Sequence, residues 1–472
     1  MTTRQGNMKA VPAPPRQLSR MSDDRLPAQS LWQAGTAAGA SRQTVLENGI
    51  RVVTEEVPGV RSIALGVLVE VGPRQELPAQ SGMAHLIEHL VFQGTGSRNA
   101  QQIASLMDLS GGQFGGFTTR DYTCYHATVL DEHRTYALDL LGDLLLNSIF
   151  APGCLEREKE AILHEIALGR DTPQQRVQDL LKALAWPAHP LGRDIAGLPE
   201  TVRNISREDL IYFFHEHYTP DRLIVAAAGN LEHDDVTAQV RDAFWRMLGQ
   251  GVPARHPTPE QRGGVKLEAA GVSQAYFAVG IPALPYAHPD RYALYIFNQI
   301  LGGGISSRLF RRLREERGLV YHVDSDYHAY RDAGMLVVSG STAPEHLTQV
   351  LGMVLLELWR AALGQDSIDD EELWRAKTQV RRQHLLAAEC TATRMSRLAT
   401  QELYFGAPIP AEAILDQIEA VDRAALRRLG NDHLADALAR TAIAVVAPEA
   451  PQLYTAEFLE ELRTSCRAGQ TR

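Results

Sequence analysis

The stretch SGMAHLIEHLVFQGTG, residues 81–96, decides how this chain is interpreted. Its apolar residues recur at helical spacing between a Ser-Gly start and a Gly-Thr-Gly stop, which predicts one helix. His85 and His89 are four positions apart, so a helix with about 3.6 residues per turn places both imidazoles on one face, where they can ligate one cation. Glu88 lies beside them on that face. One short helix therefore carries two possible metal ligands and a carboxylate, although an isolated five-residue match can also be a surface helix with polar residues placed by chance.

This combination of residues is suited to metal-assisted hydrolysis. Zinc lowers the pKa of a bound water towards about 7, and a nearby carboxylate such as Glu88 can accept its proton. A catalytic zinc also needs a third protein ligand. The predicted helix LEREKEAILHEIALGR, residues 155–170, supplies Glu165, with Glu158 two turns earlier on nearly the same face. Taken alone, such an acidic run is more typical of a solvated helix face.

The elements around the motif occur in an order that repeats. In the first half we expect strands at 44–57, interrupted by an Asn-Gly turn, and at 62–72, 111–129 and 223–230, with helices dominating 131–185. In the second half we expect strands at 275–284, 321–330, 334–341 and 441–448, with helices at 292–301 and 306–318 and long helices before the last strand. The repeat predicts an α+β protein of two homologous domains, each a mostly antiparallel sheet packed with helices on one side.

Composition sets the predicted domain boundaries. The Pro- and Gly-rich stretch 247–264 is typical of a linker. It separates a first domain at 45–246, which contains the predicted zinc-binding residues, from a second domain at 265–450, and flexible tails are expected at 1–44 and 451–472. The first tail contains several arginines, as a targeting segment would, but its prolines and acidic residues do not favour a basic amphipathic helix.

Charge and hydropathy limit the partners. The 472-residue chain has a formal charge of −10 without a basic stripe, so nucleic acid is not an expected partner. No apolar run approaches the roughly 18 residues that span a bilayer, so no membrane association is expected. Four scattered cysteines and the lack of a secretory signal favour a cytoplasmic location.

Two motifs and the order of elements between them resemble the pitrilysin-like, or M16, metallopeptidases. The motifs are H-L-I-E-H at 85–89, an H-x-x-E-H signature, and E-R-E-K-E-A-I-L-H-E at 156–165. Further similarity at 189–210 and 301–321 extends the resemblance over about 46–447. The resemblance implies one zinc ion per chain. It implies that His85, His89 and Glu165 are the zinc ligands and that Glu88 is the catalytic base. It also implies that Glu158 is a supporting acid that orients the site. Cobalt or manganese could also bind two histidines and a carboxylate, but zinc is the default.

The resemblance also gives the second half a role. Arg314 and Tyr321 match the Arg/Tyr pair with which family members bind substrate carbonyls near the metal, although each alone could be an ordinary surface or sheet residue. In the family this pair and the zinc site come from different halves, which enclose a chamber in one long chain or in two short ones. Because this chain has half the length, the resemblance implies a homodimer or a heterodimer with a related M16 subunit. The Gly-rich LGGGISSR, residues 301–308, lacks the Gly-Lys-Ser/Thr ending of a phosphate-binding loop.

Gly115, Gly116, Phe117 and Thr118 are expected on the edge strand that binds substrate. Where the family commonly has Asn-Ala, this chain has Gly115-Gly116. An extended peptide would add to such an edge through main-chain hydrogen bonds. We therefore expect a zinc-dependent metalloendopeptidase that hydrolyses unstructured peptides in a two-subunit chamber. The alternative is a non-catalytic or partner-dependent M16 subunit in a heterodimeric peptide-processing complex.

Overall fold

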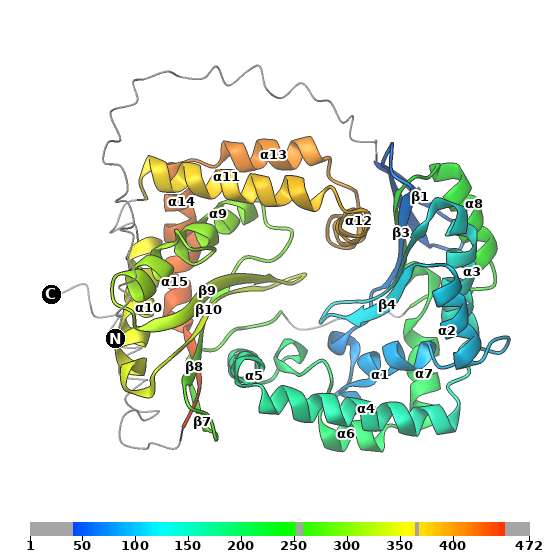
Figure 1. The fold of residues 1–472 in the computed structure, drawn as a ribbon, viewed down its shortest axis with the longest axis horizontal. Coiled ribbons are helices and arrows are strands. Elements are labelled where there is room, and N and C mark those ends of the chain that lie inside the picture. Colours follow the sequence, from blue (N-terminus) through cyan, green and yellow to red (C-terminus); the bar gives the residue numbers. More distant parts are fainter. Residues whose placement is uncertain (1–40, 252–257, 364–367, 449–472) are drawn as a thin grey trace, which may run out of the picture. The chain divides into compact units, whose positions relative to one another are not determined.

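The computed structural model describes residues 41–251, 258–363 and 368–448, and its first half contains a six-stranded sheet. The strand order is β1-β2-β6-β3-β5-β4, and β2 pairs with β6 in parallel while the other neighbours are antiparallel. Its strands are β1 Ser41–Val45, β2 Arg51–Glu56, β3 Ser62–Val69, β4 Gln113–Thr118, β5 Thr123–Leu130 and β6 Leu223–Gly229. β4 is thus an outer strand of the sheet (Figure 1).

The second half repeats this topology with five strands. The order β7-β11-β8-β10-β9 again has one parallel pair, between β7 and β11. The strands are β7 Gly264–Ala269, β8 Ala275–Ala283, β9 Val320–Ala329, β10 Gly334–Thr342 and β11 Ala442–Ala447. β9 takes the outer place that β4 takes in the first sheet, and among the described residues β1 has no counterpart in the second sheet. The predicted duplicated, mostly antiparallel α+β architecture is confirmed.

Helices fill the segments between the strands. Those of the first half are α1 Met83–Val91, α2 Ala100–Leu109, α3 Arg134–Asn147, α4 Pro152–Asp171, α5 Pro173–Ala185, α6 Pro199–Asn204, α7 Arg207–His217 and α8 His233–Phe244. Those of the second half are α9 Arg291–Leu301, α10 Leu347–Ala362, α11 Asp370–Ala387, α12 Thr391–Phe405, α13 Ala411–Ala420, α14 Arg423–Leu429 and α15 Ala435–Ala437, with π-helices η6 Phe310–Glu315 and η8 Gly430–Leu434. Short 3-10 segments are η1 Pro73–Gln75, η2 Pro78–Gln80, η3 Asp131–His133, η4 Pro190–Gly192, η5 Pro220–Arg222, η7 Pro344–His346 and η9 Leu438–Arg440. No helix in the described ranges is long and apolar enough to cross a bilayer.

Each sheet is covered on both faces, because a helix of the other half packs on the face that the helices of its own half leave open. β3 and β6 are buried along almost their whole length, because successive side chains point to opposite faces and both faces are apolar. The inner face packs against helices of its own half. On the outer face of the first sheet lies α12, with Met395 and Leu398 packed against Ala64, Leu68 and other strand residues.

Each half contributes a helix that covers the outer face of the other half's sheet. Helix α5 of the first half packs on the outer face of the second sheet, where Leu181 and Trp186 belong to one buried cluster with Met335 and Val337 of β10. Figure 1 shows α12 beside the first sheet and α5 near the strands of the second. Each half therefore completes the hydrophobic core of the other.

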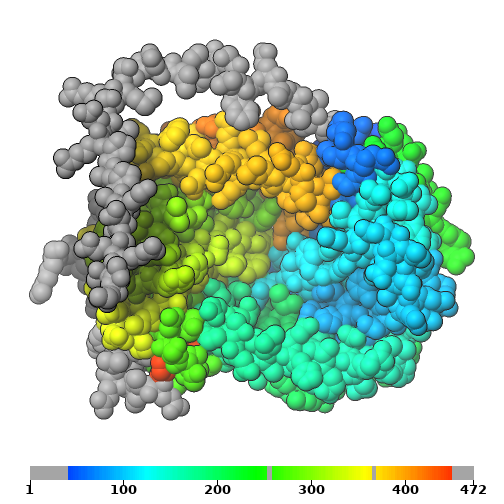
Figure 2. Space-filling model, in the orientation of Figure 1, coloured from blue at the N-terminus to red at the C-terminus, as the bar shows by residue number. Residues whose placement is uncertain are grey.

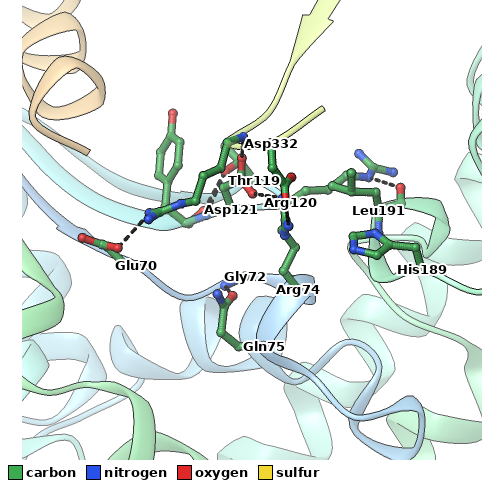
Figure 3. A network of polar contacts seen from close by, with 12 residues as sticks. Glu70, Gly72, Arg74, Gln75, Thr119, Arg120, Asp121, His189, Leu191 and Asp332 are labelled. Carbon is green, nitrogen blue, oxygen red and sulfur yellow. Dashed lines mark hydrogen bonds and ion pairs between the residues drawn. The ribbon is translucent and has the colours of Figure 1, made fainter. Parts of the chain in front are cut away.

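A polar network also joins the halves (Figure 3). The guanidinium of Arg74 donates to Asp121 at 3.1 Å and to both carboxylate oxygens of Asp332 at 2.7 Å. Arg331 follows β9 and donates through its side chain to Glu70 at 2.8 Å. The β4–β5 turn thus contacts the β9–β10 turn, its counterpart in the repeat.

The predicted boundaries compare with the elements as follows. β1 begins at Ser41, so residues 41–44, which we placed in the N-terminal tail, form part of a strand. The described residues of the expected linker, 247–251 and 258–263, are in neither helix nor strand, and β7 begins at Gly264. The remainder of the first tail and the tail at 451–472 lie outside the described residues. The helix predicted at 306–318 is present largely as η6, in which the N–H of Glu316 donates to the carbonyl of Arg311 five residues earlier.

Candidate metal site

The motif lies on α1, and the start of this helix is fixed by its sequence. Gly82 precedes the helix with φ of 96°, a left-handed conformation that glycine adopts without strain. A Cβ there would lie 2.7 Å from the carbonyl oxygen of Ala196. The buried carboxylate of Glu76 accepts hydrogen bonds from the N–H groups of Gly82 and Ala84, at 3.0 and 2.8 Å. A glycine and a buried acid thus position the helix that carries the histidines.

His85, His89 and Glu165 come together. Each provides one possible ligand atom, and these atoms lie within 4.8 Å of one another. Nε2 of His85 is 3.8 Å from Oε2 of Glu165, and Nε2 of His89 is 3.9 Å from Oε1. Ligands bound to one tetrahedral zinc at roughly 2.0–2.2 Å lie roughly 3–4 Å from each other. The three side chains are therefore spaced for one such ion.

Helix α4 supplies both acids. Leu155, Ile162 and Ile166 are buried in the core, which turns the face that carries Glu158 and Glu165 towards α1. Oε2 of Glu158 lies 3.1 Å from Nδ1 of His89. A carboxylate at one ring nitrogen of a histidine fixes the ring and leaves the other nitrogen for a metal. The teal segment that contains α4 lies at the surface in Figure 2, and the side chain of Glu165 is 50% exposed.

His85 also has the environment expected of a metal ligand. In the described part of the chain its Nδ1 is buried without a hydrogen-bond partner. Burial, and secondarily the neighbouring His89, lowers the pKa of His85 to about 4. The neutral imidazole that results is the form that binds a metal. Two imidazoles and one carboxylate make a donor set that suits Zn²⁺.

Glu88 contacts the edge strand rather than the two α4 acids. Its Oε2 accepts a hydrogen bond of 2.6 Å from Oγ1 of Thr118 in β4. Burial raises the pKa of Glu88 above its ordinary value, and the bond from Thr118 opposes that shift. Gly116 also faces this side chain, since a Cβ built there would lie 2.9 Å from Cγ of Glu88. The absence of a side chain at Gly116 therefore makes room for Glu88.

The four expected substrate-binding residues all lie in β4. Gly115 and Gly116 pair with His126 and Tyr125 of β5. Phe117 is partly exposed and packs its ring against those of Tyr122 and His126, with centroids about 6 Å away. The edge of β4 opposite β5 carries no strand among the described residues.

Arg314 and Tyr321 lie near each other in the second half of the chain. The guanidinium carbon of Arg314 lies 5.0 Å from the centre of the Tyr321 ring. Tyr321, at the start of β9, is 76% exposed. Within 41–251, 258–363 and 368–448, no hydrogen bond or ion pair connects either residue to the zinc-site side chains described above.

Two features escaped prediction from sequence. Glu76 gave no signal, because an acid in a loop looks solvent-exposed until tertiary structure buries it. A second group of possible metal ligands, His288, Asp290 and His433, also comes together. His288 and Asp290 are two positions apart, but His433 lies too far from them in sequence to complete a spacing motif.

Comparisons with known proteins identify the family of the chain. Residues 51–198 match the model of the insulinase family, peptidase family M16, and residues 204–380 match the model of the peptidase M16 inactive domain. The chain belongs to peptidase family M16. This M16 chain is 36% identical to the uncharacterized zinc protease YmxG of Bacillus subtilis, over 80% of this chain and 91% of that one. It is 35% identical to an uncharacterized zinc protease of Streptomyces coelicolor, over 89% and 92% of the two chains.

Solved structures share the fold. A peptidase M16 inactive domain from Pseudomonas fluorescens matches with a TM-score of 0.81 and 21% identity, covering 88% of this chain and 99% of that one. A protease from Helicobacter pylori matches with a TM-score of 0.78 and 20% identity, covering 87% and 100%. At such low identity these two matches concern the fold alone.

Proposed function

We propose that this M16 chain is a zinc-dependent metalloendopeptidase that hydrolyses peptide bonds in unstructured peptides. The observation that carries the proposal is the convergence of His85, His89 and Glu165 on one point, with Glu88 on the same helix. The naming of its relatives as zinc proteases agrees with it. In this proposal the domain at 45–246 holds one zinc ion and the domain at 265–450 provides Arg314 and Tyr321.

The roles of the side chains follow from their positions. Zinc held by the three ligands would supply Lewis acidity, which lowers the pKa of water near it. Glu88 accepts a proton from the attacking water and returns it to the leaving amine. Thr118 holds the carboxylate of Glu88 in place through its 2.6 Å hydrogen bond. A peptide added to the outer edge of β4 runs along the strand whose residues contact Glu88, with main-chain hydrogen bonds supplying most of its affinity.

Arg314 and Tyr321 act, in this proposal, on the substrate carbonyl bound at another subunit's zinc site. Both can donate hydrogen bonds to a developing oxyanion. The exposure of Tyr321 and its separation from this chain's own zinc-site contacts favour a site completed by a second subunit. The second subunit is another copy of the chain or a related M16 protein, and the two enclose the reaction chamber. The same observation favours a second candidate function, a subunit that is inactive without a related partner.

The test combines zinc content with cleavage of a mixed library of unstructured peptides. Wild type is expected to retain about one zinc at this site. Glu88→Gln should keep that zinc and lose about 10²- to 10⁴-fold in kcat, the usual contribution of a general base. Glu160→Gln is the control, because it removes an exposed carboxylate from α4 and should leave both properties unchanged.

The outcomes separate the candidates. Zinc binding with cleavage that depends on Glu88 supports the endopeptidase. Zinc binding without cleavage by the purified chain supports the partner-dependent subunit. If a His85→Ala/His89→Ala variant retained as much zinc as wild type, the proposed metal site would be refuted, and the proposed function with it.

A further inference from the structure

A second cluster of metal-ligating side chains lies in the other half of the molecule. His288 and Asp290 lie between β8 and the start of α9, and His433 lies in the π-helix η8. One ligand atom from each residue lies within 4.8 Å of the others. This cluster has the same two-histidine, one-carboxylate composition as the first, but none of its residues belongs to the proposed peptidase site.

The distances in the cluster match those of the first site. Oδ2 of Asp290 is 3.6 Å from Nε2 of His433 and 3.9 Å from Nδ1 of His288. The two imidazole rings meet edge to face with centroids 4.9 Å apart. These separations are close to the 3.8 and 3.9 Å between the histidines and Glu165. A small inward movement of the side chains would bring all three to bonding distance of one ion.

Asp290 is oriented as a ligand rather than as a helix cap. It occupies the N-cap position of α9, where an aspartate usually accepts a hydrogen bond from the first turn, yet its side chain makes no such bond. Its carboxylate faces the two histidines instead. The side chains of His288, His433 and Asp290 are 25%, 30% and 45% exposed, so an ion can reach them from solvent. An adjoining surface pocket is lined in part by Asp290.

We propose that His288, Asp290 and His433 form a second divalent-metal site, which takes Zn²⁺ or a similar ion that prefers imidazole ligands. Three protein ligands and a water molecule complete a tetrahedral set. Imidazole nitrogens favour zinc, nickel and copper over magnesium and calcium. The location of His433 in a π-helix is consistent with a site, since π-helical turns are frequent at functional positions.

The groups around the cluster would oppose a bound metal ion only weakly. Nδ1 of His288 accepts a 3.1 Å hydrogen bond from the N–H of Asp290, and a metal bound at Nδ1 replaces it. The cation of Arg291 is nearby and donates to the carbonyl of His288, but its guanidinium lies over the rings of Tyr292 and Phe405.

Such an ion would connect two segments that are distant in sequence. It would tie the loop before α9 to the π-helix η8 that follows α14, and the residues that flank the loop and Leu434 of η8 belong to the core of the second half. A ligand that binds only the folded state stabilises it in proportion to its free concentration. We therefore assign to the site a role in holding the second domain together, independent of hydrolysis.

The experiment counts zinc per chain after gel filtration, by elemental analysis of the whole chain. Wild type is expected to hold about two zinc ions, one at each site. His288→Asn/His433→Asn should hold about one, and so should His85→Ala/His89→Ala. His322→Asn is the matched control, because His322 also pairs with one aspartate, Asp324 at 3.4 Å, but belongs to no group of three possible ligands in the part of the chain that the structure describes. It should hold as much zinc as wild type.

A second measurement uses Co²⁺ alone as the probe, in the His85→Ala/His89→Ala background. Cobalt should produce visible absorption typical of tetrahedral coordination, and Asp290→Asn should abolish it while circular dichroism stays unchanged. Zinc should also raise the Tm of this background, but not that of the same background with His288→Asn and His433→Asn added. Equal zinc content in wild type and His288→Asn/His433→Asn, with no cobalt spectrum from the second site, would overturn the proposal. That outcome leaves the peptidase site unaffected, because the counts at His85 and His89 are measured separately.

Discussion

At the scale of single residues, Gly116 links the edge strand to the proposed base. We predict that Gly116→Ala lowers kcat by about 10- to 100-fold, since a displacement of about 1 Å at a reacting group can cost that much. The physical reason is that the added Cβ would lie 2.9 Å from Cγ of Glu88, so the carboxylate must move. Steady-state kinetics and zinc content of the same preparation measure the effect, and the zinc content should not change.

Gly115→Ala is the control for this variant. It adds the same methyl group to the neighbouring position of β4, but there the new Cβ meets His126 at 3.3 Å rather than Glu88. A loss of kcat in Gly115→Ala as large as that in Gly116→Ala would show that the strand, not the base, had been disturbed.

Glu76 should make stability depend on pH. Burial raises its pKa to about 7 from an ordinary value of 4.5, because desolvation outweighs the hydrogen bonds it accepts at the start of α1. Between those values the folded chain binds the proton more tightly than the unfolded chain does. The stability from this group is therefore fully present below pH 4.5 and is lost as the pH rises through about 7.

Urea unfolding of wild type and Glu76→Gln at about pH 5 and about pH 8 measures this contribution. The wild type should lose more stability between the two pH values than the variant, whose carboxamide does not titrate. An identical pH dependence in the two proteins would assign it to other groups.

Local chemistry explains which site residues the sequence could predict. His85, Glu88 and His89 could be placed because helical spacing alone puts them on one face. Glu165 had to be selected by family resemblance, since nothing local separates it from the other acids of α4. Glu76 could not be predicted at all, because its burial depends on elements far away in the chain.

At the scale of elements, α12 should contribute stability to the half of the molecule in which it does not lie. Met395 is buried against the outer face of the first sheet, where a Cβ added to Gly66 would meet its sulfur. Met395→Ala should reduce the free energy of unfolding by about 2–5 kcal/mol, the usual cost of such a truncation in a core. Denaturant unfolding measures this change.

Thr393→Ala, on the exposed side of α12, is the comparison. It should alter stability by less than about 0.5 kcal/mol, as surface substitutions usually do. Similar losses in the two variants would mean that the contact with the sheet contributes little. The sequence predicted long helices in this region but not the sheet they cover, because an apolar helix face shows that it is buried without showing against what.

At the scale of the whole molecule, the proposed exchange of Arg314 and Tyr321 between subunits can be tested by mixing. If the chain forms homodimers, Glu88→Gln and Arg314→Ala should each be inactive alone. Mixed in equal amounts and allowed to exchange, they should recover about a quarter of wild-type activity, because half of the dimers are mixed and each has one intact site. Cleavage of a fluorogenic peptide before and after mixing measures the recovery.

The control mixes Glu88→Gln with His85→Ala, two variants damaged in the same half-site. No combination of these chains contains an intact zinc site with its base, so activity should stay at background. Recovery of activity in this control would contradict the proposed exchange. If the wild type is an active homodimer, a lack of recovery in the mixture of Glu88→Gln and Arg314→Ala would contradict it too.

Because each half covers the other half's sheet with a helix, the order of synthesis matters for folding. The first sheet is complete in sequence once β6 ends at Gly229, but the helix that covers its outer face begins only at Thr391. At usual rates of translation, the ribosome needs on the order of ten seconds or more to synthesise the residues between them. During that interval the nascent chain presents an apolar sheet face to solvent or to any chaperone near the exit tunnel. Because contacts between distant segments also slow folding, completion of the native core must wait until nearly the whole chain has emerged.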